Sequence, residues 1–376
     1  LKPRTSNLHI GLLTPDLSHA HGWAHHSLSL LEALNRAGVQ LTVIAAKNSP
    51  DVDGITVHKL LPNVTPADGN LLLNLALAAP RVRALLRDCD VLHTTIEPYA
   101  PLAAWVAGKR PLFITGHGSY VRLPITRRWP VGALYAWAFR SGCMITVSRY
   151  TAKVAQRVLP GLRTVVVNNG VDAAKFEHLP PLETSIKGRI VLSVGGIKAR
   201  KGSLELVRAL AVVRQQIPDV QGVILGGMKA ELDYVARVRA EIEALGLSEC
   251  VHLLGHVPES ALLGWYSAAD VFALPSVNVG TSFEGYGLVH LEASAAGLPI
   301  IGTTDCGAED AVDDGITGLL VPQRDLTRRL PEAIITLLTD RERAAQMGAA
   351  GRDKARHQTW DHIAAQTLAV YRAKDC

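Results

Sequence analysis

The feature that most constrains the fold is an order of apolar strand, loop, helix and strand that opens the chain and begins again in its second half. Leu8–Thr14 reads as a buried strand, His26–Ala37 as a helix and Val39–Ala46 as the next strand, and the pattern restarts at Ile190–Val194. Continuous apolar strands joined through helices are typical of a parallel sheet that is covered on both faces. The sequence therefore predicts an α/β protein with two similar, doubly wound, Rossmann-like halves.

The length of the chain also indicates two domains, because its 376 residues suit two units of about 150–200 residues each. The proline-rich, polar segment 178–188 has no periodicity and is predicted to be a linker between an N-terminal domain, 1–180, and a C-terminal domain, 187–358. Two such halves predict a cleft between them, with ligands at the carboxyl ends of the strands. A last helix within 359–376 has apolar positions that need a partner surface: Trp360, Ile363, Leu368 and Val370.

Composition narrows the class of partner. The chain is 48% hydrophobic and 19% charged, and its net charge of +5 suits anionic ligands or an anionic membrane surface rather than nucleic acid. Five cysteines without C-x-x-C spacing predict reduced thiols and a cytoplasmic location. No apolar run reaches the roughly 18–20 residues of a membrane span, so any membrane contact is expected to be peripheral.

The stretch Ser282–Ile301 places two carboxylates, Glu284 and Glu292, around a Gly-x-Gly turn that precedes a helix. The helix is predicted to end at Gly297, before a proline. A helix N-terminus offers free backbone N–H groups and a partial positive charge, and glycines let a phosphate approach the backbone. Glu292, inside the helix, can accept hydrogen bonds from sugar hydroxyls. The stretch therefore predicts a nucleotide-sugar site.

A second glycine-rich loop, Gly195–Gly202, follows the first strand of the second half and contains Arg200 and Lys201. Arg200 can hold a diphosphate with its fork of donors, and Lys201 can act as a point charge. The alternative for this loop alone is an exposed basic turn.

Histidines suggest a second kind of chemistry. His117 lies between two glycines at a predicted strand end, where its imidazole could donate to a substrate oxygen or relay a proton. The alternative is a histidine in an ordinary turn. His19, His21, His25 and His26 resemble a metal cluster at first sight, but no cysteine or carboxylate accompanies them after Asp16. A solvated surface is the favoured interpretation, followed by a role for one of them that faces the donor or acceptor.

Other patterns in the sequence concern metal, nucleotide and membrane binding. Asp51-x-Asp53 and Asp88-x-Asp90 match a metal-binding pattern but are interpreted as turn or cap residues, because neither ends an apolar strand. Neither a dinucleotide-binding G-x-G-x-x-G after the first strand nor a P-loop is present. Tyr120–Tyr135 mixes arginines with aromatic residues and suggests peripheral contact with a membrane or a lipid-linked acceptor, with an ordinary surface loop and helix as the alternative.

With these motifs in hand, the chain resembles the retaining glycosyltransferases of family four, which have the GT-B fold of two facing Rossmann-like domains. The resemblance covers nearly the full length. The motifs follow the order of the family: D-V-L-H-T at Asp90, T-G-H-G at Thr115, V-S-R-Y-T at Val147, N-N-G-V-D at Asn168, the R-K-G loop, A-A-D-V-F-A-L-P-S at Ala268 and the paired glutamates. In that family the C-terminal helix crosses back to the first domain.

The resemblance implies roles for single residues. Glu292 would bind the ribose, Lys201 would neutralise the diphosphate, and Glu284 with the backbone of 286–289 would hold the donor sugar and its phosphates. His117 would contact the sugar near the reacting carbon. The implied catalytic set is His117, Glu284, Lys201 and Arg200, and the implied donor-binding set is Gly22, Gly195, Gly196, Arg200, Lys201, His256, Val257, Glu284, Gly285, Tyr286, Gly287, Leu288, Val289 and Glu292.

One residue departs from the family pattern. Gly196 stands where the family commonly has an arginine, and Arg200 is the candidate to supply the missing charge.

The expected activity is transfer of a sugar from a nucleoside-diphosphate sugar to a hydroxyl of a sugar, lipid-linked or small-molecule acceptor. Configuration would be retained, with no metal or other cofactor, in the synthesis of a polysaccharide, glycolipid or glycosylated metabolite. The alternatives are a sugar-nucleotide epimerase of similar fold and a non-catalytic nucleotide-sugar binding protein. The enzyme is expected in the cytoplasm, with peripheral contact at the inner face of the membrane through 120–135.

Overall fold

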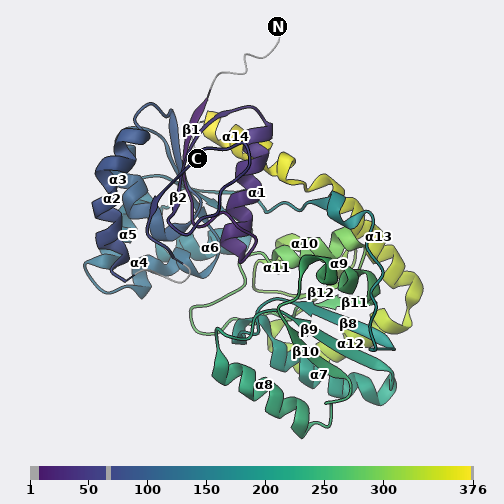
Figure 1. The fold of residues 1–376 in the computed structure, drawn as a ribbon. Coiled ribbons are helices and arrows are strands. Elements are labelled where there is room, and N and C mark those ends of the chain that lie inside the picture. The colour runs from purple at the N-terminus through teal and green to yellow at the C-terminus, as the bar shows by residue number, and fades with distance from the viewer. Residues whose placement is uncertain (1–7, 65–68, 374–376) are drawn as a thin grey trace. The chain divides into compact units, whose positions relative to one another are not determined.

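The computed structural model describes residues 8–64 and 69–373, which divide into two compact units (Figure 1). The first unit comprises Leu1–Asn169 and Trp360–Cys376, and the second comprises Gly170–Thr359. The predicted linker 178–188 thus lies within the second unit. Cys376 and the other predicted features that fall on 1–7, 65–68 and 374–376 lie outside the described residues.

The first unit is built on a parallel sheet with strand order β3-β2-β1-β4-β5-β6-β7. The central strand β1 pairs with β2 on one side and with β4 on the other. The strands are short and largely buried, as their continuous apolar runs predict. Their bounds are β1 His9–Leu13, β2 Gln40–Ala46, β3 Val57–Leu61, β4 Val91–Thr94, β5 Leu112–Gly116, β6 Cys143–Thr146 and β7 Thr164–Val166.

Helices cover both faces of this sheet, with α1 and α14 together on one face and α2, α3 and α5 on the other (Figure 1). The α-helices of the unit are α1 Gly22–Arg36, α2 Leu71–Leu85, α3 Ala100–Ala107, α4 Leu123–Thr126, α5 Val131–Arg140, α6 Arg149–Val158 and α14 Trp360–Ala373. Two short 3₁₀ segments, η1 Glu97–Tyr99 and η2 Ser119–Arg122, follow strands β4 and β5.

The tail helix α14 belongs to the first unit. Its buried residues recur at helical spacing and form one stripe: Trp360, Ile363, Ala364, Thr367, Leu368 and Tyr371. The expectation that Val370 is part of this stripe is wrong, since it is only half-buried. Tyr371 takes its place, with its hydroxyl 2.6 Å from Nδ1 of the buried His93 and its ring against Phe113. The tail therefore supplies part of the core of the first unit.

The second unit repeats the plan in a sheet with strand order β10-β9-β8-β11-β12-β13. Helices α7, α8 and α12 cover one face of this sheet, and α9, α10 and α13 cover the other (Figure 1). The strands are β8 Arg189–Val194, β9 Val220–Leu225, β10 Val251–Gly255, β11 Val271–Ala273, β12 Ile300–Thr303 and β13 Gly318–Val321.

The helices of the second unit follow the sequence pattern closely where glycine or proline marks their ends. Helix α10 runs from Leu288 to Ala296 between two left-handed glycines, Gly287 and Gly297, as predicted. Helices α12 and α13 were not predicted. The remaining bounds are η3 Ala173–Phe176, η4 Ala199–Lys201, α7 Ser203–Gln216, α8 Leu232–Ala244, α9 Glu259–Ala268, α11 Ala308–Ala311, η5 Gln323–Asp325, α12 Leu326–Thr339 and α13 Arg341–His357.

Candidate active site

In each sheet the strand order reverses at one point, between β1 and β4 in the first and between β8 and β11 in the second. Because successive strands diverge there, the loops that leave the carboxyl ends of the two strands leave a crevice, which is where open parallel sheets bind ligands. In the second unit these loops are 195–202 and 274–287, the two that the sequence singles out. The fold thus brings together segments that are about eighty residues apart in the chain.

A cluster of charges forms where these two loops meet. Lys201 Nζ lies 2.6 Å and Arg200 Nη1 lies 2.7 Å from Oε2 of Glu284. The hydroxyl of Ser276 lies 3.4 Å from the same oxygen. Glu284 is buried, with 6% of its surface exposed. Two cations against one carboxylate leave the cluster with a net positive charge, which suits an incoming diphosphate.

Burial and charge act in opposite directions on this cluster. Burial by itself raises the pKa of the Glu284 carboxyl, but the adjacent Arg200 and Lys201 outweigh it and hold that pKa well below its usual range. Burial lowers the pKa of the Lys201 ammonium, and the Glu284 carboxylate opposes that effect. Glu284 is therefore ionised and held in place by its ion pairs, so it is available as a hydrogen-bond acceptor and not as an acid.

Two glycines of the first loop are required by its geometry. Gly202 has φ of +71°, and a Cβ there would lie 1.9 Å from the Pro275 carbonyl oxygen. Gly195 has φ of +148°, and a Cβ there would lie 3.3 Å from Cε of Lys201. Gly196 differs, because its φ is ordinary and a Cβ would come no closer than 3.5 Å to a neighbour. The backbone at 196 thus has room for a Cβ, the first atom of the arginine side chain that the resemblance leads one to expect there.

The N-terminus of α10 has the features expected of a phosphate site. Its N-cap is Gly287, which has φ of +80° and provides no side-chain cap. Burial lowers the pKa of His290 to about 4, and its Nδ1 lies 3.0 Å from the Gly287 carbonyl oxygen, to which the neutral ring donates. Tyr286 is turned into the core, where its hydroxyl accepts from Gln358. The residues predicted to hold phosphate through their backbone, 286–289, therefore lie at an uncapped helix end.

Glu292 lies in the second turn of α10. Its Oε2 accepts a hydrogen bond of 2.9 Å from the hydroxyl of Tyr266, which is buried. Burial raises the pKa of Glu292, and the hydrogen bond from Tyr266 opposes that shift. Tyr266 was not predicted from the sequence; the signal for it is a tyrosine on the helix that precedes strand β11.

The other predicted donor-site residues lie at several places. His256 and Val257 directly follow β10, at the same edge of the second sheet as the charged loops, and Gly285 lies beside Gly307. Gly22 is the first residue of α1 in the first unit, where a Cβ would meet nothing within 4 Å. Nothing in the local packing therefore requires glycine at 22.

In the first unit, His117 follows β5 and is held twice by the loop after β4. Its Nε2 lies 2.7 Å from the Thr95 carbonyl oxygen, and its backbone N–H donates to Oε1 of Glu97 at 2.7 Å. Since a carbonyl only accepts, Nε2 carries the proton. Burial lowers the pKa of His117 to about 4. The imidazole is therefore neutral at pH 7, with its lone pair on Nδ1.

Aromatic rings surround this histidine. His26 meets it edge to face at 4.6 Å, and Trp23 lies between His117 and Tyr120, 4.5 Å from the tyrosine ring. His26 is buried, with Nδ1 3.0 Å from the side-chain oxygen of Asn169. The expectation that this histidine belongs to a solvated surface is wrong for His26, because helix α1 turns it into the protein.

Glu97, like Tyr266, was not predicted from the sequence. It is fully buried, and burial raises its pKa to about 8. The signal that could have revealed it is a lone carboxylate at the start of an apolar run, I-E-P-Y-A-P-L-A-A, that directly follows a predicted strand.

The D-x-D motifs have structural partners. Asp90 accepts from the backbone of His9 at the start of β1, Asp88 pairs with Arg87, and Asp51 pairs with Lys59. His21 pairs with Asp16 and caps α1. Within the described ranges, no three or more His, Cys, Asp or Glu side chains gather as they do around a metal ion.

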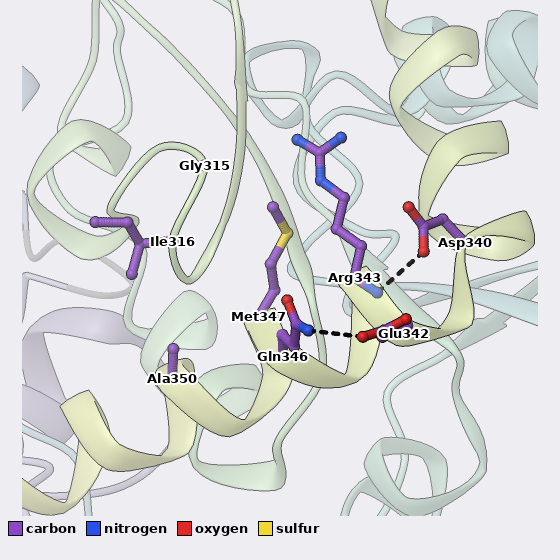
Figure 2. A pocket seen from close by; sticks show the side chains of 8 residues that line it. All are labelled: Gly315, Ile316, Asp340, Glu342, Arg343, Gln346, Met347 and Ala350. Atoms are coloured by element: carbon purple, nitrogen blue, oxygen red, sulfur yellow. Dashed lines mark hydrogen bonds between the residues drawn. The ribbon is translucent and has the colours of Figure 1, made fainter.

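The hollow shown in Figure 2 is not part of this arrangement. It lies on the second unit beside helix α13 and contains none of the predicted site residues. Its polar contacts are local, from the Arg343 backbone to Asp340 and from Gln346 to Glu342. Its lining is Gly315, Ile316, Asp340, Glu342, Arg343, Gln346, Met347 and Ala350.

The structure also bears on two expectations from composition, the state of the cysteines and the lack of a membrane-spanning helix. Cys89, Cys250 and Cys306 are buried free thiols, but the expectation of reduced thiols is wrong for Cys143, which is disulfide-bonded. Of the helices in the part of the chain that the structure describes, none combines the length and the apolar character needed to cross a membrane.

Comparison with known proteins assigns the chain to a family. The Glycosyltransferase Family 4 model matches residues 20–175, and the Glycosyl transferases group 1 model matches residues 175–354. A GDP-mannose-dependent alpha-(1-6)-phosphatidylinositol monomannoside mannosyltransferase of Mycobacterium tuberculosis is 32% identical over 314 residues, which cover 78% of this chain and 79% of the relative. A phosphatidyl-myo-inositol mannosyltransferase of Mycobacterium leprae is 30% identical over 378 residues, covering 97% and 96%.

Solved structures agree on the fold. Sucrose-phosphate synthase from Thermosynechococcus elongatus superposes with a TM-score of 0.79 at 24% identity, covering 97% of this chain and 98% of the other. An Anabaena protein in complex with UDP and glucose superposes with a TM-score of 0.75 at 20% identity, covering 97% and 100%. Both likenesses, with the two parallel sheets, confirm the GT-B architecture. The chain belongs to glycosyltransferase family 4, with a second half of the glycosyl transferases group 1 type, and is a glycosyltransferase.

Proposed function

We propose that this glycosyltransferase moves a hexose from a nucleoside-diphosphate sugar to an acceptor hydroxyl with retention of configuration and without a metal. The observation that supports this most is the cluster of Arg200, Lys201 and Glu284 at the point where the strand order of the second sheet reverses. The second unit binds the donor. The first unit, with His117, binds the acceptor and the transferred sugar.

The donor diphosphate binds to the two cations and to the N-terminus of α10. Both cations contact Oε2 of Glu284, and in residues 8–64 and 69–373 the hydrogen bonds to this carboxylate all fall on that oxygen. Oε1 is then the atom that accepts a hydrogen bond from a hydroxyl of the donor sugar. Glu292, steadied by Tyr266, accepts the ribose hydroxyls. Arg200 supplies the charge that the arginine at position 196 provides in the family.

The chemistry is electrostatic. As the glycosidic bond breaks, negative charge grows on the departing diphosphate and positive charge grows on the sugar ring. Fixed cations and an uncapped helix end stabilise the negative charge on the diphosphate more strongly in a water-poor site than in bulk water. In a front-face reaction a phosphate oxygen of the leaving group takes the proton of the acceptor hydroxyl, so retention needs no protein nucleophile.

His117 suits the other end of the breaking bond because it is neutral. With a pKa lowered to about 4 by burial, it places no positive charge beside the developing cation of the ring. Its Nδ1 lone pair can accept a sugar hydroxyl, because the Thr95 carbonyl fixes the proton on Nε2. We assign to it the orientation of the transferred sugar.

GDP-mannose is the first donor to test, and an inositol-containing lipid is the first acceptor. Both follow from the names of relatives that are 30–32% identical to this chain. Nothing in the two loops distinguishes guanine from another base. The donor panel should therefore include UDP- and ADP-sugars.

The deciding experiment is a transfer assay with each donor, with and without EDTA. Release of the nucleoside diphosphate together with a glycosylated acceptor whose anomeric configuration matches the donor by NMR supports the proposal. Inversion would refute the retaining mechanism, and loss of turnover in EDTA that Mg²⁺ or Mn²⁺ restores would refute metal independence. An altered donor sugar without any acceptor would point to an epimerase, and donor binding without turnover to a binding protein.

We further propose that the segment 120–135 contacts an anionic membrane where a lipid-linked acceptor is bound. Several large apolar side chains in and near it are exposed: Tyr120, Ile125, Trp129, Leu134 and Trp137, with Trp129 at 85%. Arg127 and Arg128 are exposed beside them. Aromatic residues and arginines together suit the headgroup layer.

Co-sedimentation with vesicles tests this contact. The protein should bind vesicles that contain phosphatidylserine or phosphatidylinositol better than neutral vesicles, and salt should weaken the binding. Replacing Trp129 by alanine, or Arg127 and Arg128 by glutamate, should release it. Replacing the exposed Leu232 of the second unit by alanine is the control. Equal binding by the wild type and these variants would refute the assignment.

A further inference from the structure

The feature that the proposed chemistry leaves unexplained is a set of buried polar atoms in the first unit, two of them on residues that contact His117. In the described parts of the chain, three such atoms of this unit have no hydrogen-bond partner: Oγ1 of Thr14, Nε2 of His26 and Oε2 of Glu97. Thr14 and Glu97 follow β1 and β4, the two strands between which the order of the first sheet reverses. Of the three residues, only Glu97 bonds directly to His117.

The bonds around Glu97 fix both the main chain and the ring of His117. Oε1 of Glu97 accepts the His117 backbone N–H at 2.7 Å, and two residues earlier the Thr95 carbonyl accepts from the His117 ring at 2.7 Å. The next residue, Gly118, has φ of +150°, a conformation that side-chain-bearing residues rarely adopt. The carboxyl therefore bonds to the chain directly before a residue whose backbone conformation favours glycine.

We infer that Glu97 is a positioning residue of the transfer reaction, and that it acts as a neutral carboxylic acid that holds the His117–Gly118 backbone so that the imidazole faces the sugar. The inference rests on the proposed role of His117. Glu97 is fully buried, so it acts through His117 and does not touch substrate.

The neutral state follows from the surroundings. Burial raises the pKa of Glu97 to about 8, although the backbone N–H groups of His117 and Gly118 pull it down. The titratable groups that face it are His117, Tyr120 on η2 and Tyr135 on α5, whose hydroxyl donates to the Pro98 carbonyl. Burial raises the pKa of Tyr135 to about 12, and that of Tyr120 is also raised. Neither tyrosine ionises near pH 8, so among these facing groups a change in that range belongs to Glu97.

Ionisation of Glu97 should lower activity at alkaline pH. Below pH 8 the carboxyl keeps its proton and the loop keeps its geometry. Above pH 8 a charge without a counter-ion forms in the core, and the buried ion disturbs the backbone that it holds. The turnover number, kcat, should therefore fall above pH 8 while the KM for the donor, whose nucleoside diphosphate the second unit binds, changes little.

The experiment compares Glu97→Gln with Glu97→Ala. Glutamine keeps a neutral acceptor for the His117 N–H and should retain kcat within about threefold, but its kcat should no longer fall above pH 8. Alanine removes the acceptor and should lower kcat by about 10- to 100-fold at unchanged donor KM, because a small misplacement of a catalytic group is costly. The exposed Glu183→Ala is the matched control and should behave as wild type.

Each outcome decides the inference. If wild type transfers sugar and Glu97→Ala matches it, or if Glu97→Gln is as impaired as Glu97→Ala, the neutral positioning role is refuted. Thermal unfolding of each variant separates a folding defect from a displaced His117. The test of the neutral carboxyl does not depend on the alanine variant, because only Glu97→Gln is expected to abolish the fall of kcat above pH 8.

A second readout does not depend on activity. In protein labelled with ¹⁵N-histidine, the backbone amide signal of His117, assigned by its loss in His117→Asn, should titrate near pH 8 in wild type and not in Glu97→Gln. A flat signal in wild type would refute the inference. If wild type transfers no sugar from any donor, the proposed function fails, and this titration still judges the contact between Glu97 and His117.

Discussion

The two sheets share the strand order up to their sixth strand, but the buried carboxylates beside the two points of reversal, Glu284 and Glu97, differ in charge. In the second, a buried carboxylate, Glu284, stays ionised because Arg200 and Lys201 contact it. In the first, burial raises the pKa of Glu97 to about 8 and lowers that of His117 to about 4, so both are neutral at pH 7. The difference teaches that the partners of a buried group, and not burial alone, decide its charge.

This division suits a reaction that separates charge. The ionised cluster belongs to the unit assigned to the diphosphate, where negative charge grows, and the neutral pair belongs to the unit assigned to the sugar ring, where positive charge grows. A cation beside the ring would raise the barrier, whereas a cation beside the phosphates lowers it. The comparison therefore predicts different consequences for changes of charge in the two units.

The largest effect is expected for Lys201→Ala. It removes a cation 2.6 Å from Glu284, and we expect kcat/KM to fall by about 10²- to 10³-fold, as when one fixed donor to a developing anion is lost. Steady-state kinetics with the best donor measure it. Lys198→Ala, in the same loop but without an ion pair to a described residue, is the matched control. Equal losses in both variants would mean that the loop contributes only general positive charge.

The sequence carried much of the second site because local signals marked it. Gly287 and Gly297 predict the ends of α10, and the R-K-G loop lies directly between a strand and a helix. Parallel topology then requires both loops to leave the sheet at the same edge, so the meeting of Lys201 with Glu284 was foreseeable in outline. Their distances and the shared oxygen Oε2 were not.

The first site was harder to predict because its chemistry depends on burial. Glu97 and His93 are fully buried, yet no sequence pattern states which of the 34 acidic or 14 histidine residues lose contact with water. The sequence also does not separate helix α5 from the arginine-rich segment around it, and it does not distinguish the buried Tyr371 from the half-buried Val370. Each of these depends on packing between segments far apart in the chain.

An effect of intermediate size is expected in acid. Burial lowers the pKa of His93 to about 3 and of His117 to about 4, and that of His26 is also lowered. Between pH 6.5 and pH 4 the unfolded chain binds protons at these sites that the folded unit does not, so stability falls as pH falls. Glu97 has the opposite effect between pH 8 and pH 4.5, because there the folded unit binds a proton that the unfolded chain does not. It is one group against three, so the net stability still falls. The Tm of the first unit should drop by a few degrees from pH 7 to pH 5.

Tryptophan fluorescence can follow this unit in the intact chain, because Trp265 alone of the six tryptophans belongs to the second unit. Replacing His93 by asparagine should reduce the dependence of Tm on pH, whereas replacing the exposed His357 should not. A Tm that is constant from pH 7 to pH 5 would contradict the neutral interior assigned to the first unit.

The smallest effect, and the finest test of the ionised cluster, is a rescue at Gly196. Arg200→Ala should lower kcat/KM by about tenfold if Arg200 supplies charge to the diphosphate, about what one charge-assisted hydrogen bond contributes. The backbone at 196 accepts a side chain without close contact, so Gly196→Arg should fold and, combined with Arg200→Ala, restore most of the loss. Gly196→Gln in the same background is the uncharged control. Rescue by arginine and not by glutamine would show that the cluster needs a second cation, and that this cation can come from position 196 as well as from position 200. Failure of both, with folding intact, would mean that Arg200 acts by holding Glu284, and the compensation seen in the second unit would then be structural.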